Sequence, residues 1–317
     1  MRNPINQRKV AVVGCGFVGA ATAFTLMQSG LFSEMVLIDA NFDKADGEAK
    51  DISHGIPFAG QMKIYAGDYD DASDAAIMII TAGANQAPGE TRLDLVSKNV
   101  AIYKEIIPEI ARRDFHGIML IVSNPVDILT HVAVKLSGLP ENRVIGSGTV
   151  LDTARLKYAI GQHLDVDSRS VHAFIIGEHG DSEIAAWGST NVSGIPLADF
   201  CEMRGHTDHK QEMRRIAEEV KGSAYDIIAK KRATYYGIAM SVRRICECIM
   251  RDEKSILPVS AEMHGEYGIE GIALSMPSIV GSSGFETHVP IQLTPDEADA
   301  LRRSAGILRD VISGLDI

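Results

Sequence analysis

The sequence has few of the features that mark secreted, membrane-spanning or zinc-stabilised proteins. Its 317 residues contain four cysteines, none of them in a CxxC pair or in a Cys/His cluster with zinc spacing. We therefore expect a reducing compartment, the cytoplasm, and no metal. No stretch approaches the ~20 apolar residues of a membrane-spanning helix, so no membrane association is expected.

One apolar run has the layout of a signal peptide. It extends from Val10 to Met27 and follows Arg8 and Lys9. Its glycines, however, fall at a spacing that secretion does not require and phosphate binding does. We therefore favour a nucleotide-binding loop in this segment.

Clusters of basic residues are also absent. Lysine and arginine number 31 against 42 aspartate and glutamate residues, giving a formal net charge of −11, and no basic run is long enough to neutralise a phosphate backbone. Nucleic acid is therefore not an expected partner, and an anionic substrate would need locally placed arginines. With 45% hydrophobic residues and neither repeats nor low-complexity tracts, the chain should fold throughout.

The first half of the chain alternates short apolar runs with amphipathic stretches. The apolar runs are KVAVVG, MVLID, AIMIITAG and IMLIVSNP, and the stretches that follow them cover 17–29, 43–53, 93–113 and 126–137. Strands apolar on both faces, alternating with helices, predict a doubly wound parallel (Rossmann) sheet of an α/β protein. Longer helical patterns mixed with strand-like pieces follow. We expect a nucleotide-binding domain over 1–146 and a mixed α+β catalytic domain over 147–317.

A glycine motif lies where the first strand meets the first helix. Gly14, Gly16 and Gly19 form GxGxxG, in which the first glycine turns the chain, the second lets a pyrophosphate approach and the third lets helix and strand pack closely. Twenty residues after Gly19, the second strand ends in Asp39, whose carboxylate can accept both ribose hydroxyls of an adenosine. Because Asp39 would repel a 2′-phosphate, NAD is predicted rather than NADP. In the alternative interpretation, the glycines form a structural turn and Asp39 caps a helix.

Two loops at the carboxyl ends of predicted strands carry polar groups. The loop GANQAPGETR runs from Gly83 to Arg92 and includes Gln86, and the motif SNPVD places Asn124 between a strand and a helix. Ligands of open α/β sheets bind outside the carboxyl ends of the strands, which favours a binding role for both loops. Asparagine in this position is also a common helix cap.

Two further motifs contain ionisable side chains. In GSGTVLDTAR, Thr149 has the place of a helix N-cap, and Asp152 and Arg155 lie three residues apart on one helical face. Taken alone, this pair is best interpreted as a capping-box acid with an i,i+3 ion pair. In IIGEHGDSE, His179 follows a strand, and taken alone it is better interpreted as a surface-loop histidine.

Together, these motifs resemble those of one protein family. In order, VGCGFVG, VLIDAN, TAGANQAPGETRLDL, SNPVD, GSGTVLDTAR and GEHGDSE are similar to the lactate/malate dehydrogenase family, and most closely to its bacterial L-lactate dehydrogenase branch. The similarity extends from about Lys9 to the C-terminal helix. It implies NAD-dependent hydride transfer between NADH and pyruvate, giving (S)-lactate, and a homotetrameric assembly.

The resemblance implies a role for each polar residue. His179 is the implied proton donor and acceptor, oriented by Asp152, while Arg155 binds the substrate carboxylate and Arg92 polarises the carbonyl. A charged imidazole and a guanidinium suit the negative charge that develops on the carbonyl oxygen. The remaining implied contacts are Gln86, Asn124 and Thr234 around the substrate, and Gly14, Gly16, Phe17, Val18, Gly19, Asp39, Gly83 and Asn124 around the cofactor.

Gln86 bears on the choice of substrate. In malate dehydrogenases of the family the matching position carries arginine, which pairs with the second carboxylate of oxaloacetate. The neutral side chain here favours pyruvate, because a dianion would leave a charge unpaired. Malate or a bulkier 2-hydroxy acid is the nearest alternative substrate.

Two other protein classes are more distant alternatives. An NAD-dependent glycosidase would need a Cys/His metal site, which the sequence lacks. A non-catalytic NAD-binding protein would not need the ionisable residues that the sequence retains.

The resemblance also suggests a regulatory site. Many bacterial L-lactate dehydrogenases bind fructose 1,6-bisphosphate between subunits through an arginine and a histidine, and the matching positions here are Lys157 and His172. Lysine keeps the charge of arginine but lacks its planar fork, so such a site should be weak and sensitive to salt. In the alternative interpretation, Lys157 is a solvated helix charge and His172 a strand histidine facing an interface.

Overall fold

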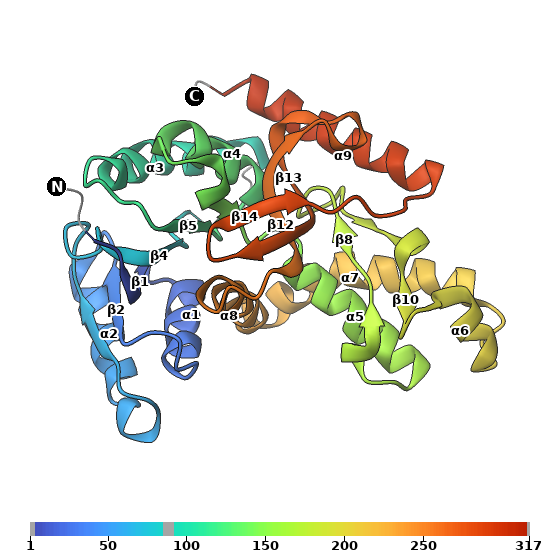
Figure 1. Cartoon of the computed structure of the whole chain (residues 1–317), viewed down its shortest axis with the longest axis horizontal. Coiled ribbons are helices and arrows are strands. Elements are labelled where there is room, and N and C mark those ends of the chain that lie inside the picture. Colours follow the sequence, from blue (N-terminus) through green and yellow to red (C-terminus); the bar gives the residue numbers. More distant parts are fainter. Residues whose placement is uncertain (1–3, 85–91, 316–317) are drawn as a thin grey trace.

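A nine-stranded sheet runs through the computed structural model, which describes residues 4–84 and 92–315 (Figure 1). In those residues the strand order is β14-β13-β12-β6-β5-β4-β1-β2-β3. The first half of the chain forms β1 (Asn6–Val13), α1 (Phe17–Met27), β2 (Glu34–Ile38), α2 (Phe42–Ser53), β3 (Lys63–Ala66), β4 (Ala75–Ile80), α3 (Arg92–Ala111), β5 (Ile118–Ile121), α4 (Val126–Ser137) and β6 (Val144–Gly146).

The second half of the chain mixes short strands with long helices. Its elements are α5 (Val150–Leu164), β7 (Val171–His172), β8 (Ile175–Ile176), β9 (Ile184–Ala185), β10 (Asn191–Val192), β11 (Ile195–Pro196), α6 (Leu197–Met203), α7 (His209–Lys231), α8 (Tyr236–Met250), β12 (Ser255–His264), β13 (Glu270–Gly281), β14 (Gly284–His288) and α9 (Pro295–Ser313).

The parallel part of the sheet has the strand order β3-β2-β1-β4-β5-β6, which is that of a doubly wound dinucleotide-binding fold. The predicted α/β class is confirmed. The order reverses next to β1, which pairs with β2 on one side and β4 on the other. Ligands of such sheets bind at this reversal, outside the carboxyl ends of the strands. Because β1 ends at Val13, the glycine motif lies at that edge.

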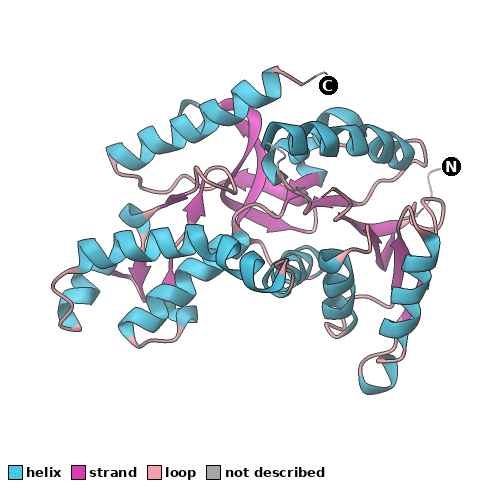
Figure 2. Ribbon diagram, turned by 180° about the vertical axis from the view of Figure 1, so that it is seen from behind, coloured by secondary structure: helices cyan, strands magenta, loops and turns pink. Residues whose placement is uncertain are grey.

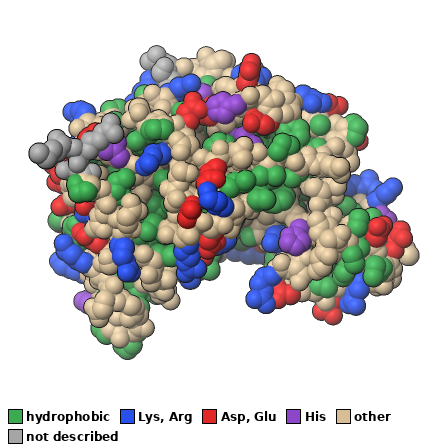
Figure 3. All heavy atoms as spheres, viewed as in Figure 1, with side chains coloured by type: hydrophobic (Ala, Val, Ile, Leu, Met, Phe, Trp, Pro, Cys, Tyr) green, Lys and Arg blue, Asp and Glu red, His purple; other side chains and the backbone are tan. Residues whose placement is uncertain are grey.

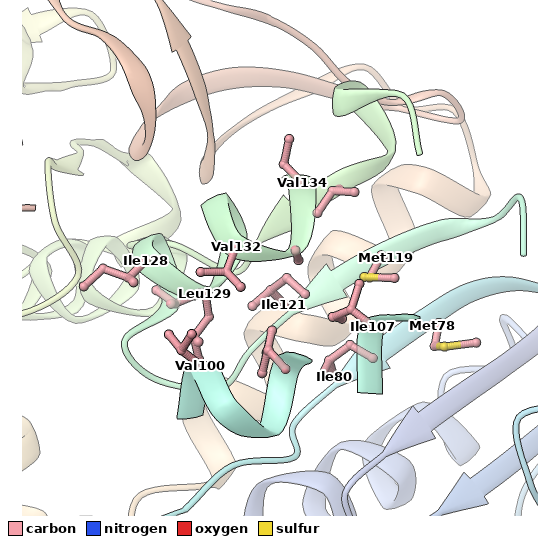
Figure 4. Packing of buried hydrophobic residues seen from close by; sticks show 14 of the residues in the cluster. Met78, Ile80, Val100, Ile107, Met119, Ile121, Ile128, Leu129, Val132 and Val134 are labelled. Atoms are coloured by element: carbon pink, nitrogen blue, oxygen red, sulfur yellow. The ribbon is translucent and has the colours of Figure 1, made fainter. Parts of the chain in front are cut away.

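Helices cover both faces of the parallel sheet, which explains why its strands are apolar throughout. Along β4, Met78 and Ile80 pack into a core shared with α3 and α4, whereas Ile77 and Ile79 pack into a core shared with α1 and α8. All residues of β4 are buried. Figure 4 shows the first of these cores, in which side chains of β4 and β5 face those of α3 and α4.

The second half of the chain extends the sheet and adds a separate layer. β12 pairs antiparallel with β6 where Ser260 lies opposite Gly146, and β13 and β14 continue the sheet outward. The small sheets β11-β10-β7 and β8-β9 pack with α5, α6 and α7 around a third core (Figure 2). This arrangement confirms the predicted mixed α+β architecture.

The residues that precede α9 and α5 differ in whether they cap the helix. Thr294 and Glu297 form a capping box at the start of α9, in which Thr294 N donates to Glu297 Oε2 at 2.8 Å and Glu297 N donates to Thr294 Oγ1. Thr149 precedes α5 as predicted, but its hydroxyl donates to the carbonyl oxygen of Ile175 at 2.6 Å and does not cap the helix. Thr149 is fully buried, so the nearby strand carbonyl competes successfully for its hydroxyl.

The surface and the thiols are unremarkable. Acidic and basic side chains are interspersed over the face drawn in Figure 3. All four cysteines, Cys15, Cys201, Cys246 and Cys248, are buried as free thiols. Over the described part of the chain, no helix is both long enough and apolar enough to cross a membrane.

Candidate active site

The three glycines of the nucleotide motif have distinct steric roles. A Cβ on Gly14, whose φ is +99°, would lie 2.5 Å from Ala82 N, and a Cβ on Gly19 would lie 1.8 Å from the carbonyl oxygen of Gly14. These two positions therefore exclude any side chain. Gly16 is exposed, and a Cβ there would meet nothing within 4 Å. The middle glycine thus leaves the backbone open, as a pyrophosphate requires.

The start of α1 fits an anionic ligand. Gly16 is its N-cap and supplies no side-chain hydrogen bond, so the first N–H groups of the helix stay available for an anion. Phe17, 65% exposed, stacks on Tyr235 with ring centroids 5.5 Å apart, which joins this turn to the loop between α7 and α8. Val18 packs against the core beneath.

Asp39 lies beside this turn. Its Oδ2 accepts from Cys15 N at 2.7 Å, and its Oδ1 accepts from Asn41 N at 3.0 Å. The cap of α2 is Asn41, whose side chain accepts from Lys44 N, so the interpretation of Asp39 as a helix cap is wrong. A partly exposed carboxylate at the end of β2, held beside the glycine turn, fits the ribose of a dinucleotide.

Asp152 links His179 to Arg155. Its Oδ2 lies 2.5 Å from His179 Nδ1, and its Oδ1 accepts from an Arg155 guanidinium N–H at 2.7 Å. The Asp152 side chain is 3% exposed and that of His179 24% exposed. The predicted i,i+3 ion pair of Asp152 with Arg155 is confirmed, but Asp152 is not a capping-box acid, and His179 is not a simple surface-loop histidine.

The charges around His179 favour its protonated form. Burial alone would lower its pKa, but the charge and hydrogen bond of Asp152, together with the charges of Asp127 and Glu183, raise the pKa of His179 to about 9. Burial also opposes the ionised form of Asp152, but His179 and Arg155 outweigh this effect and lower the pKa of Asp152. The site therefore keeps an imidazolium and a carboxylate paired at neutral pH.

Sequence reasoning assigned no role to Asp127, the first acidic residue of α4. Its Oδ2 accepts from the backbone N of His179 at 2.7 Å, and its Oδ1 accepts from Ser260 Oγ at 2.6 Å and Ser275 Oγ at 2.9 Å. It is buried, and it fixes the His179 loop against β12 and β13. In the sequence, Asp127 is marked only by its place in the SNPVD motif, at the start of the largely apolar helix VDILTHVAV.

A second missed residue, Asn99 of α3, connects the loops that follow β4 and β5. Its Oδ1 accepts from Ala84 N at 2.7 Å, and its Nδ2 donates to the carbonyl oxygen of Asn124 at 2.7 Å. Gly83 and Asn124 are both exposed at this edge of the sheet, and the Asn124–Pro125 peptide is cis. The N-cap of α4 is Pro125, so Asn124 does not cap that helix.

The remaining predicted residues are the substrate contacts Gln86, Arg92 and Thr234 and the possible effector residues Lys157 and His172. Gln86 and the Arg92 side chain lie outside the described part of the chain, although Arg92 begins α3. Thr234 is half-buried in the loop between α7 and α8, next to Tyr235. Lys157 is half-buried on α5, where burial lowers its pKa, and His172 is exposed on β7 opposite Asn191.

Comparison with known proteins covers almost the whole chain. Residues 8–146 match the family model for the NAD-binding domain of lactate/malate dehydrogenases, and residues 149–315 match the model for their α/β C-terminal domain. The chain is 52% identical to the L-lactate dehydrogenase of Acetivibrio thermocellus over 98% of each chain, and 52% identical to that of Thermoanaerobacterium saccharolyticum over 98% of this chain and 99% of the other. It is similar to the ligand-bound crystal structure of the minor L-lactate dehydrogenase from Enterococcus mundtii, with a TM-score of 0.95, 44% identity, and 98% and 99% of the two chains covered.

Proposed function

The chain belongs to the lactate/malate dehydrogenase family, and on that premise we propose that it is an NAD-dependent L-lactate dehydrogenase, which interconverts pyruvate and (S)-lactate. One observation carries the proposal: a single buried carboxylate, that of Asp152, holds both the imidazole of His179 and the guanidinium of Arg155. This places a proton donor beside a group suited to a substrate carboxylate.

The chain's own residues supply binding, orientation and the proton, while bound NADH supplies the hydride. Arg155 binds the carboxylate of pyruvate with its planar fork. His179, charged at neutral pH, donates its proton to the carbonyl oxygen during reduction and takes one from lactate in the reverse direction. Asp152 and Asp127 orient His179 from its ring and from its backbone. In this proposal Arg92 completes the site by polarising the carbonyl.

The geometry of residues 1–146 supports the proposed cofactor contacts. Gly14 and Gly19 shape the turn, and Gly16 admits the pyrophosphate to the start of α1. Asp39 accepts the ribose hydroxyls. The other contacts in this proposal are Phe17, Val18, Gly83 and Asn124, at the same edge of the sheet. No residue is assigned to a metal.

Substrate choice rests on Gln86 and Thr234. A neutral Gln86 leaves the methyl group of pyruvate without an unpaired charge, whereas a second carboxylate would be buried without a partner. Malate dehydrogenase activity is the second candidate, because the family contains both activities.

The direct test is NADH oxidation, followed by its absorbance, with pyruvate, oxaloacetate and longer 2-oxo acids side by side. Pyruvate should have the highest kcat/KM. A preference for oxaloacetate would identify a malate dehydrogenase, and binding of NADH without turnover of any 2-oxo acid would identify a non-catalytic protein.

Assembly and regulation form a further part of the proposal. We assign residues 1–146 to the cofactor domain and 147–317 to the catalytic domain, in a cytoplasmic homotetramer. A bisphosphate site at Lys157 and His172 would lie outside the catalytic cluster. Light scattering tests the tetramer, and kinetics with fructose 1,6-bisphosphate test the effector site.

A further inference from the structure

A third ionisable side chain, that of Glu183, lies against the pair formed by Asp152 and His179. One carboxylate oxygen of Asp152, one carboxylate oxygen of Glu183 and one ring nitrogen of His179 all lie within 4.8 Å of one another. Glu183 follows His179 in a turn closed by a hydrogen bond from Glu183 N to the carbonyl oxygen of Gly180 at 3.1 Å, and it directly precedes β9. The backbone therefore directs this carboxyl to the catalytic pair.

The two carboxyls of this cluster are not equivalent. Asp152 accepts from both His179 and Arg155, so its negative charge is compensated. Within the part of the chain that the structure describes, Glu183 Oε1 is shielded from solvent and has no hydrogen-bond partner. An ionised oxygen in this position would be desolvated, unpaired and close to another anion. The electrostatic free energy of the cluster is therefore lowest when Asp152 is ionised and Glu183 is protonated.

The charged groups around Glu183 agree with this division. Burial and the negative charge of Asp152 raise its pKa to about 8, while the positive charges of His179, Arg155 on α5 and Lys221 on α7 act in the opposite direction. In turn, the charge of an ionised Glu183 favours the imidazolium of His179.

We propose that Glu183 is a positioning residue for the dehydrogenase reaction, which is un-ionised beside the Asp152–His179 pair at neutral pH and releases its proton to solvent on the alkaline side, so that His179 stays charged over a wider pH range. The inference rests on the proposed function, because it concerns the proton that His179 donates to pyruvate. Glu183 acts through His179 and does not contact the reacting atoms.

The test is the pH dependence of kcat/KM for pyruvate in Glu183→Gln, which keeps the shape of the un-ionised side chain but cannot ionise. At pH 7 the variant should bind NADH and turn over nearly as the wild type does. Its alkaline limb should move to lower pH by about one unit, since a charge within ~4–6 Å shifts a pKa by about 1 to 3 units. Glu183→Asp should recover part of the shift.

The matched control is Glu178→Gln, the same substitution in the same loop at a carboxylate that accepts from Ser182 Oγ at 2.5 Å. If only the packing of the loop mattered, both variants would shift the alkaline limb of the kcat/KM profile by the same amount, and this result would overturn the proposal. Superimposable profiles of wild type and Glu183→Gln, or a limb moved to higher pH, would also overturn it.

A second measurement does not depend on turnover. The infrared spectrum of the wild type minus that of Glu183→Gln should show the C=O band of one un-ionised carboxyl at pH 7, and this difference band should disappear as the pH rises through about 8. Lack of any difference between the two proteins at pH 7 would show an ionised Glu183 and overturn the proposal. If pyruvate is not reduced at all, the proposed function fails, and the infrared band still reports the proton on Glu183.

Discussion

The carboxylate of Asp152 and the imidazole of His179 are 27 residues apart in the sequence and meet at 2.5 Å. Asp152 lies in the first turn of α5, and His179 lies in the loop between β8 and β9. The long-range contact is supported from behind, because the backbone N of His179 donates to the buried Asp127 of α4. Three segments of the chain therefore fix one imidazole.

Replacing His179 with Asn should remove the proton donor and leave the cofactor site intact. General acid catalysis contributes ~10² to 10⁴-fold, so kcat for pyruvate should fall by at least ~10²-fold. Affinity for NADH, measured by fluorescence titration, should change little, since Gly14, Gly16, Gly19 and Asp39 are untouched. A variant that keeps more than about a tenth of the wild-type kcat would contradict the role of His179.

Replacing Asp152 with Asn should shift the pH profile and flatten the pH dependence of stability. The pKa of His179 is about 9 in the folded protein and about 6.5 when unfolded. Since the pKa of His179 is higher in the folded protein than in the unfolded one, protonated His179 stabilises the fold. This contribution is complete below pH ~6.5 and is lost as the pH rises through about 9. A difference of one pKa unit corresponds to about 1.4 kcal/mol, so the contribution to the free energy of unfolding is at most ~3 kcal/mol.

In Asp152→Asn the alkaline limb of pyruvate reduction should therefore move well below pH 9, and the fall in Tm between pH 6.5 and 9 should shrink. The control is Asp167→Asn, which removes an exposed carboxylate paired with Arg169 on the surface. If both substitutions changed the pH profile and the pH dependence of Tm equally, the Asp152–His179 pair would not be the cause of either effect.

Two glycine substitutions should separate cofactor binding from folding. Gly16→Ala adds a methyl group where nothing lies within 4 Å, so Tm should hold while the KM for NADH rises, because the methyl occupies the approach of the pyrophosphate. Gly19→Ala places a Cβ 1.8 Å from the carbonyl oxygen of Gly14, so α1 must move away from β1 and Tm should fall as well. The reverse pattern would contradict the assigned orientation of the loop.

The parts of the fold and site that the sequence predicted are those encoded by local pattern. The stretch 126–137 coincides with α4, and the stretch 17–29 extends two residues past the end of α1. The steric need for Gly14 and Gly19 was likewise visible, since it arises where one strand turns into one helix.

The unpredicted parts depend on partners that are distant in sequence. Asp127 is hydrogen-bonded to Ser260 and Ser275, which are 133 and 148 residues away, so the local sequence does not show which groups it holds together. Local reasoning correctly paired Asp152 with Arg155 but missed its contact with His179, and it misjudged Thr149, because tertiary packing offered each residue a partner beyond its own helix end. The extension of the parallel sheet by β12–β14 is of the same kind.

Replacing Gln86 with Arg should move the preference from pyruvate toward oxaloacetate. The new guanidinium would pair with the second carboxylate of the dianion and leave an unpaired charge against the methyl group of pyruvate. Such a desolvated pair is worth several kcal/mol, so the ratio of the two kcat/KM values should change by ~10³-fold or more. Gln86→Leu is the matched control for loss of the amide alone. An unchanged ratio would mean that this loop does not contact the far end of the substrate.

A bisphosphate should activate the enzyme weakly, through Lys157 and His172. Lys157 is half-buried, and burial lowers its pKa, so a bound phosphate would restore a favourable environment for its charge. Because lysine lacks the planar fork of arginine, millimolar fructose 1,6-bisphosphate should lower the apparent KM for pyruvate only modestly, and less so at high salt. Lys157→Arg should strengthen the effect, and His172→Ala should remove it. If the pyruvate saturation curves superimpose with and without the effector, in both the wild type and Lys157→Arg, then Lys157 is a helix charge without a ligand and the enzyme is not regulated in this way.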